Sequence, residues 1–157
     1  MLMLLALFEW MEQSSLAVAI RGTRWPMPIF LTFHAVGLTL LIGTIIVVSL
    51  RLLGLLMPNR PVSEIAAEVW RWSFAGLTMS LTSGLLLFIP EPLRWYNSAS
   101  FWTKMSFLFL AIFFHFTVYR RVTQASEVRP VVYRLCGILA LLLWYGVALG
   151  GRALTFE

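Results

Sequence analysis

The fold is decided by an apolar stretch from Met27 to Leu50, which reads MPIFLTFHAVGLTLLIGTIIVVSL. It carries no Asp, Glu, Lys or Arg, and it is long enough to cross a hydrocarbon core of ~30 Å, which takes about 20 helical residues. Pro26 precedes the stretch and Arg51 closes it. Proline suits the first turn of a helix because its missing N–H needs no partner there. The stretch therefore predicts a membrane-spanning helix.

Three further apolar stretches have a similar length. They run from about Val69 to Ile89, from Phe101 to Tyr119 and from Val131 to Gly151. Short connections join them, so neighbouring helices should be antiparallel. We expect an all-α integral membrane protein in which residues 27–151 form a four-helix up-down-up-down transmembrane bundle.

Composition agrees with this class. Of the 157 residues, 60% are hydrophobic and 12% are charged, whereas globular domains have about 45–50% apolar and about 25% charged residues. A soluble domain of this size would expose large apolar patches. The single cysteine, Cys136, excludes an internal disulfide. The net charge is +5, and most of the twelve Lys and Arg residues lie between the apolar runs, so we interpret them as topology signals and expect no nucleic-acid partner.

The first 20 residues follow a different pattern. Glu9, Glu12 and Gln13 fall on one helical face, and leucine and aromatic residues cover the rest. This pattern predicts an amphipathic helix lying in the membrane interface over residues 1–20. The alternative is a fifth, partial span, in which the two carboxylates would be costly at mid-bilayer.

The positive charges predict an orientation. Seven of the twelve Lys and Arg residues lie at the first and third loops or the span ends beside them, and five lie at the opposite side. Because cytoplasmic loops carry an excess of Lys and Arg, we expect both termini on the outer side.

His34 and His115 are the only histidines, and both lie inside predicted spans. An ionisable side chain in hydrocarbon marks a functional site or needs a hydrogen-bond partner across the bundle. At ~1.5 Å per residue the two rings should differ in depth by about 14 Å. One metal bound by both would need nitrogens only about 4 Å apart, so the sequence favours two separate polar levels.

Depth matching assigns companions to each histidine. Ser83, Lys104 and Tyr145 share the level of His34, and Ser73 and Cys136 share the level of His115. Cys136 and the mid-membrane Met79 are soft metal ligands, but packing is the commoner role of such residues. The sequence has no phosphate-binding glycine loop, no His-x-x-x-His or Glu-x-x-His pair and no carboxylate inside a span. We therefore expect the protein to have no catalytic activity of its own.

Several motifs resemble those of small bacterial membrane proteins with a domain of unknown function. These are Phe33–Leu38 (FHAVGL), Thr82–Phe88 (TSGLLLF) and Phe114–Arg120 (FHFTVYR). The family's layout is similar to that of CopD-like copper proteins and four-helix b-type cytochromes, which implies His34 and His115 as cofactor or metal ligands. The chain departs from the family pattern at Ser49, where Asp is usual, and in lacking a polar residue one turn before His115.

These features together lead to a functional expectation. We expect a multi-pass protein of the bacterial inner membrane, with periplasmic termini, that binds b-type haem for electron transfer or anchors a larger complex. Ser83, Lys104 and Tyr145 would bond a propionate or a quinone oxygen. The alternatives are a non-catalytic structural subunit and CopD-like transport of copper or a small solute. The expected partners are the lipid bilayer, other membrane or periplasmic subunits, and quinone.

Overall fold

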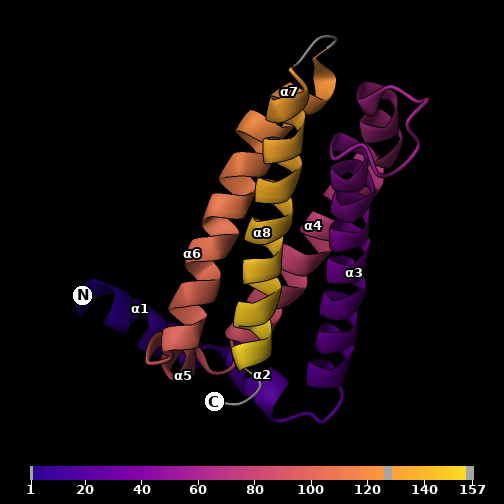
Figure 1. The fold of residues 1–157 in the computed structure, drawn as a ribbon. Coiled ribbons are helices and arrows are strands. Elements are labelled where there is room, and N and C mark those ends of the chain that lie inside the picture. The colour runs from indigo at the N-terminus through magenta and orange to yellow at the C-terminus, as the bar shows by residue number, and fades with distance from the viewer. Residues whose placement is uncertain (1, 126–128, 155–157) are drawn as a thin grey trace.

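The computed structural model describes residues 2–125 and 129–154, and the regular secondary structure in these ranges is entirely helical. The all-α prediction is thereby confirmed. Four long helical segments follow one another (Figure 1): α3 (Pro26–Leu52), α4 (Val62–Phe88), Ala99–Gln124, and α8 (Pro130–Ala153). The third segment is built from α6 (Ala99–Phe114), a π-helical turn η1 (His115–Tyr119) and α7 (Arg120–Gln124).

The long segments run up, down, up and down (Figure 1). One hairpin consists of α3 and α4, the other of the α6–α7 segment and α8, and α3 packs on α8 to join them. Helix α4 packs mainly on α3 and meets the third segment at α7. The side of the bundle between α4 and α6 is therefore the least closely packed.

Three of the segments are long and apolar enough to cross a membrane: α3, Ala99–Gln124 and α8. Helix α4 is not among them, although it has 27 residues. Glu64, Glu68 and Arg71 occupy its first turns, and serine and threonine recur further along. The sequence predicts four spans, and the helices found in the described ranges support three.

Most of the surface of these helices faces outward. Only 22% of the most apolar part of α3 is buried within the chain, and the values for Ala99–Gln124 and α8 are 17% and 28%. Large apolar side chains are left exposed, among them Phe109 (71%) and Leu135 (62%). Surfaces of this kind are consistent with contact with a lipid bilayer.

The N-terminal segment forms two short helices, where the sequence predicts one. Helix α1 (Leu2–Glu12) ends before α2 (Ser15–Arg21) begins. The break lies at Ser14, whose hydroxyl accepts a hydrogen bond from the N–H of Ala17 at 3.2 Å and caps α2. Serine favours such a cap because its oxygen satisfies an amide that the helix leaves free.

The N-terminal helices dock on the end of the bundle that also holds the last turn of α8 (Figure 1). The ring of Phe8 packs edge-on against Phe88 and against Tyr96 of α5 (Pro92–Tyr96). Arg21 donates to the carbonyl of Pro90 at 2.9 Å and to that of Glu12 at 2.6 Å. This arginine, interpreted above as a topology signal, also joins α1 and α2 to the end of α4.

Two glycines let α3 and α4 meet backbone to backbone. A Cβ atom on Gly76 would lie 2.7 Å from the backbone nitrogen of Leu41 and 2.8 Å from the carbonyl oxygen of Gly37. A Cβ atom on Gly37 would lie 2.9 Å from the backbone nitrogen of Ser80. Small residues at these positions permit the close packing that stabilises helix pairs in membranes.

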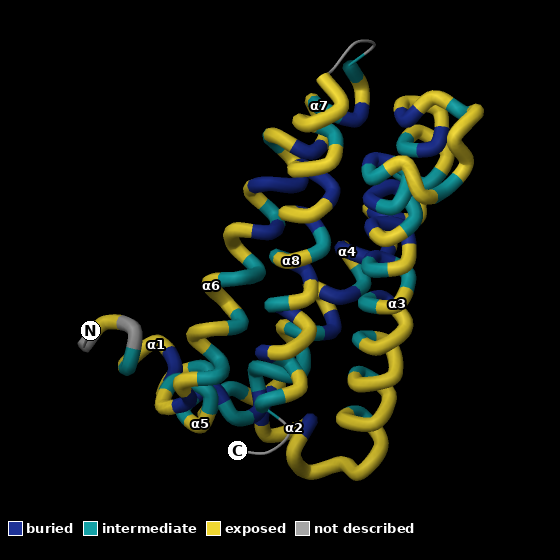
Figure 2. The backbone as a smooth tube through the Cα atoms, viewed as in Figure 1, coloured by how far each residue is buried: buried dark blue, intermediate teal, exposed yellow. Residues whose placement is uncertain are grey.

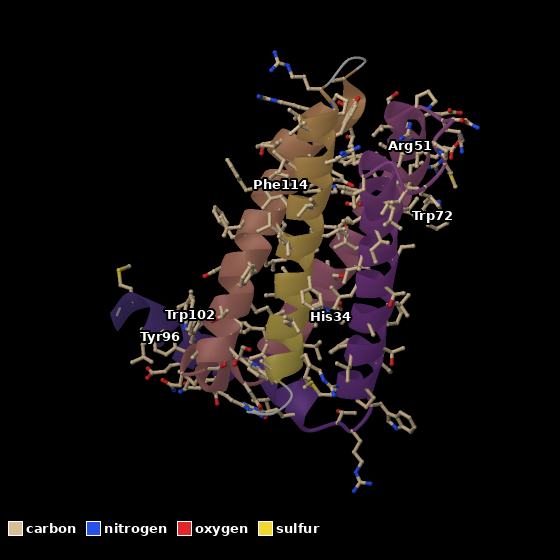
Figure 3. All side chains as sticks on the ribbon, viewed as in Figure 1. His34, Arg51, Trp72, Tyr96, Trp102 and Phe114 are labelled. Atoms are coloured by element: carbon tan, nitrogen blue, oxygen red, sulfur yellow. The ribbon has the colours of Figure 1, made fainter. Side chains whose placement is uncertain are left out.

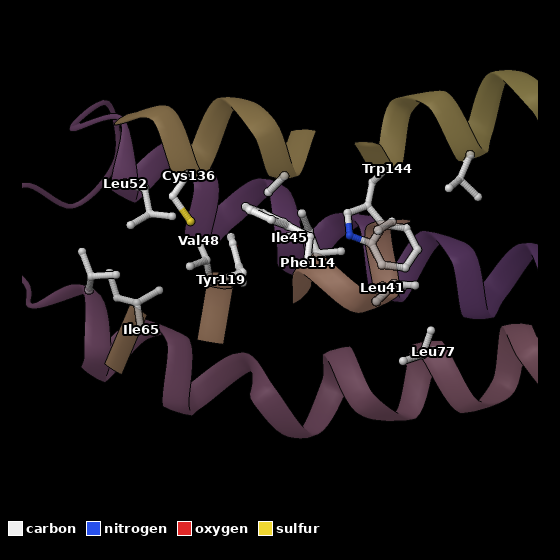
Figure 4. Close-up of a cluster of buried hydrophobic side chains, with 14 residues drawn as sticks. Leu41, Ile45, Val48, Leu52, Ile65, Leu77, Phe114, Tyr119, Cys136 and Trp144 are labelled. Carbon is white, nitrogen blue, oxygen red and sulfur yellow. The ribbon is translucent and has the colours of Figure 1, made fainter. Parts of the chain in front are cut away.

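The hydrophobic core lies in the half of the bundle nearest α7. Figure 2 shows buried residues concentrated there, while the first turns of α3 are largely exposed. Figure 4 shows the core side chains, which come from α3, α4, the third segment and α8: they include Leu41, Ile45, Val48, Leu52, Ile65, Leu77, Phe114, Tyr119, Cys136 and Trp144.

The first loop is fixed by arginine hydrogen bonds. At the end of helix α3, Gly54 takes a positive φ of 79° and the N–H of Leu55 bonds to the carbonyl of Leu50. This arrangement is a Schellman motif. Arg51, labelled in Figure 3, donates through Nε to the carbonyl of Arg60 at 2.8 Å. Arg60 in turn pairs with Glu64 at 2.8 Å and with both carboxylate oxygens of Glu68.

The stability of the fold should depend on pH through the Arg60–Glu68 pair. Hydrogen bonds from Arg60 lower the pKa of the Glu68 carboxyl below its ordinary value of 4.5, and those from Glu68 raise the pKa of Arg60. A lowered carboxyl pKa stabilises the fold above the unfolded-state value, and that contribution is lost as the pH falls through the folded value. We expect the Glu68 carboxyl to titrate below pH 4.5 in an NMR titration. An Arg60→Gln variant in which the pKa stays unchanged would contradict the assignment.

Candidate functional site

His115 is enclosed by aromatic rings from three helical segments. It begins η1 and is 6% exposed. Its ring stacks on that of Tyr119 with centroids 5.1 Å apart, and it lies nearly parallel to Trp70 of α4 at 6.1 Å. Trp144 of α8 approaches edge-on at 6.4 Å. The imidazole is thus held by ring packing.

The π-helical turn sets the direction of this ring. The N–H of Arg120 bonds to the carbonyl of His115, five residues earlier, as a π turn requires. Both His115 and Tyr119 are buried, so η1 presents two rings to the interior within one turn. Single π turns inside α-helices are rare and are frequent at functional sites.

A cavity of about 210 Å³ lies beside His115, between α3, α4 and the η1–α7 segment. Apolar side chains of α3 and α4 form much of its wall. Its lining also includes the polar or aromatic residues Thr44, Trp70, Ser73, His115, Tyr119 and Arg120. No carboxylate or thiol from residues 2–125 or 129–154 lines it.

Two buried residues in this wall form no side-chain hydrogen bond within the part of the chain that the structure describes. These are His115 and Ser73, which is 5% exposed. The nearby hydroxyl of Thr44, in contrast, donates to the carbonyl of Leu41 at 2.8 Å. Because buried polar groups are nearly always hydrogen-bonded to protein or to water, His115 and Ser73 are available to a ligand in the cavity.

A positive charge lies at the α7 end of the cavity. The guanidinium of Arg120 lies over the Trp70 ring, 4.7 Å from its centroid, in a cation–π contact. The residue is otherwise exposed. Arg120 therefore brings charge to the rim of the cavity, and the lining deeper inside is neutral.

His34 has a different environment. Its Nδ1 lies 2.9 Å from the carbonyl oxygen of Ser80 and 3.1 Å from Oγ of Ser83, both on α4. A carbonyl only accepts, so Nδ1 carries the proton and donates. Figure 3 shows His34 on the side of α3 that faces the other long helices. A Cβ atom on Gly84 would lie 3.2 Å from Cε1 of His34, so the ring packs tightly between α3 and α4.

Of the residues that the depth argument places with His34, Lys104 is turned toward a neighbouring helix and Tyr145 is turned outward. The Lys104 backbone packs against Gly150 of α8, where a Cβ atom would lie 3.0 Å from its Cα. The Tyr145 side chain is 63% exposed, because it lies about 100° around α8 from the buried Trp144.

The two histidines lie at separate levels of the bundle. On α4 the partner of His115 is Trp70 and a partner of His34 is Ser83. These partners are more than three helical turns apart, about 20 Å at ~1.5 Å per residue. The structure therefore does not bring both imidazoles to one metal.

The other potential metal ligands are also dispersed. Within the described ranges no three His, Cys, Asp or Glu side chains come together as a metal-binding group. Cys136 is buried in the apolar core. Its neighbour Gly137 packs on α3, where a Cβ atom would lie 3.0 Å from the carbonyl oxygen of Ser49. This environment is that of a packing residue.

A family model matches residues 7–157, almost the whole chain. The chain belongs to the DUF6644 family. It is described as a family of unknown function, which confirms the resemblance to small membrane proteins with a domain of unknown function. No curated protein and no solved structure matches the chain.

Sequence reasoning identified His115 and Ser73 but missed most of the cavity. From its place at the start of the predicted span 69–89, Trp70 is expected to be an interfacial anchor, and Arg120 is expected to be a topology signal. Tyr119 follows His115 by four residues, the spacing that places two side chains on one helical face, and this was the available signal. The approach of Trp70 to His115 depends on the packing of α4 on α7, for which local sequence gives no signal.

Proposed function

We propose that this chain is a four-span protein of the bacterial inner membrane that holds a redox cofactor within its helices, for electron transfer or as the membrane anchor of a larger complex. The observation that carries the proposal is the cavity beside His115, in which the side chains of two buried residues, His115 and Ser73, form no hydrogen bond with the residues that the structure describes. A concave site with a few convergent polar groups is the usual form of a ligand site.

The proposed topology makes α4 the fourth span. Its 27 residues extend about 40 Å at ~1.5 Å per residue, enough to cross the bilayer with its charged first turns outside. Four crossings place α1 and the end of α8 on one side, which agrees with Figure 1. The excess of Lys and Arg at the first and third loops supports periplasmic termini.

The imidazole of His115 is a suitable ligand for haem, but the cavity is too small to hold haem. Imidazole is a common axial ligand of haem iron, which supplies one-electron chemistry. The cavity of about 210 Å³ is smaller than the ~300–1,000 Å³ typical of cofactor pockets. Since His34 lies at a different level, it cannot supply the second axial ligand at His115. The lining around His115 fits a smaller ligand better.

A structural role for His34 is the second candidate function. Its hydrogen bonds to Ser80 and Ser83 join α3 to α4, and this is how polar side chains stabilise helix pairs in membranes. If the whole chain acts as a non-catalytic subunit, both histidines serve packing alone.

The proposal predicts that the detergent-purified protein carries a redox-active group that depends on His115. Absorption spectra before and after dithionite, metal analysis and mass analysis of the organic extract should reveal it in the unaltered protein. We expect the group to be lost in His115→Ala and kept in His34→Ala. Protein without pigment, metal or extractable redox compound, purified from cells well supplied with haem, would overturn the redox proposal and favour the structural subunit.

A further inference from the structure

The chemistry of the His115 cavity narrows the class of ligand. Its lining has no carboxylate or thiol from the described ranges, so hard and soft metal ions lack their preferred ligands. Among the described residues of the lining, Arg120 is the only charged one, and it lies at the rim over Trp70. The interior therefore suits a neutral molecule that accepts hydrogen bonds from His115 and Ser73.

The shape of the cavity favours a single ring. Trp70, His115 and Tyr119 line it, and the His115 ring stacks on Tyr119 and lies nearly parallel to Trp70. A protein cavity of roughly 150 Å³ accepts one benzene molecule, so about 210 Å³ leaves room for one ring with small substituents. Planar rings pack well against aromatic walls.

The side chains around the cavity would suit a ligand whose ring carries an apolar tail. The Trp70 ring contacts Phe74 of α4 and Phe116 of η1, with centroids 6.4 and 5.9 Å away. Phe74 is 54% exposed and Phe116 is 37% exposed, so both rings lie on the outer surface of the bundle. They flank the sparsely packed side between α4 and α6, next to Trp70 in the cavity wall.

We infer that the His115 cavity binds the ring of a lipid-soluble quinone. His115 and Ser73 provide hydrogen bonds for carbonyl oxygens, the aromatic walls hold the ring, and the isoprenoid tail leaves past Phe74 and Phe116. This inference rests on the proposed function, since it names the redox compound that the cavity holds. A carbonyl-bearing ring would supply hydrogen-bond acceptors for His115 and Ser73, the two buried polar residues of the wall that form no side-chain hydrogen bond within the described part of the chain.

The test is a binding titration with a benzoquinone that carries a decyl tail, using protein in lipid nanodiscs and empty nanodiscs as background. The same tail on a plain benzene ring is the matched probe. We expect saturable binding of the quinone, at least about tenfold weaker binding of the benzene probe, and a similar loss in His115→Phe and in Ser73→Ala. His34→Leu, at the other level, should bind as the unaltered protein does.

Equal binding of both probes, or unchanged binding in both cavity variants, would overturn the quinone inference. A haem spectrum that depends on His115, without quinone binding, would overturn it and leave the proposed function standing. If the protein neither binds the quinone nor carries a redox-active group after purification, both proposals are overturned. Thermal unfolding of each variant in detergent reports whether the bundle is intact, and Ser73→Ala keeps the test decisive if His115→Phe is poorly folded.

Discussion

Replacing Gly76 by leucine is expected to abolish the folded bundle. A Cβ atom at this position would lie 2.7 Å from a backbone nitrogen of α3 and 2.8 Å from a backbone oxygen, and neither can move without separating the two helices. Since α3 and α4 form the most extensive contact of the fold, the variant should give aggregated protein or no monodisperse peak in detergent size-exclusion chromatography.

Gly43 provides the matched control. It lies on the same hairpin, and a Cβ atom there would have no neighbour within 4 Å. Gly43→Leu should be purified in the yield and elution volume of the unaltered protein. Folded Gly76→Leu with an unchanged melting temperature would show that α3 and α4 do not pack as described.

The second large effect is expected at His34. His34→Leu replaces the imidazole by an apolar side chain of similar bulk and removes the hydrogen bonds to Ser80 and Ser83. Side-chain hydrogen bonds between membrane helices contribute ~0.6 kcal/mol on average and up to about 1.7 kcal/mol. We expect a loss in unfolding free energy of about 1 kcal/mol, measured by denaturant unfolding in mixed micelles.

The same unfolding measurement on His115→Phe provides the comparison with His34→Leu. The imidazole of His115 forms no hydrogen bond with the described part of the chain, and phenylalanine keeps its aromatic packing. Its unfolding free energy in the absence of ligand should therefore stay within about 0.5 kcal/mol of the unaltered protein. A larger loss in His115→Phe than in His34→Leu would reverse the roles assigned to the two histidines.

The sequence predicted the long helices because uninterrupted apolar runs are their cause. The stretch from Met27 to Leu50 lies within α3, and that from Val131 to Gly151 lies within α8. The separate levels of His34 and His115 also followed from helical rise alone. These predictions depend on local composition and on regular geometry, which a single sequence contains.

The features that the sequence did not predict depend on tertiary packing or on departures from regular helix geometry. The break at Ser14 required recognising a serine as an N-cap within an apolar run. The outward direction of Tyr145 follows from which face of α8 packs on α3 and α6. The π turn at His115 cannot be read from a helical pattern, because one extra residue in a turn leaves hydropathy unchanged.

The π turn also has an evolutionary consequence. Deleting one residue between His115 and Tyr119 would restore regular α-helix, and the parts of the third segment on either side would stay nearly in register, because the π turn takes up the extra residue within a single turn. The two rings would then be three residues apart instead of four and their stacking would change, yet the hydropathy of the span would hardly change. A single codon therefore separates a bundle with this pair of rings in the cavity wall from one without it. Within the DUF6644 family, a one-residue gap at this turn would distinguish chains that keep the site from those that retain only the scaffold.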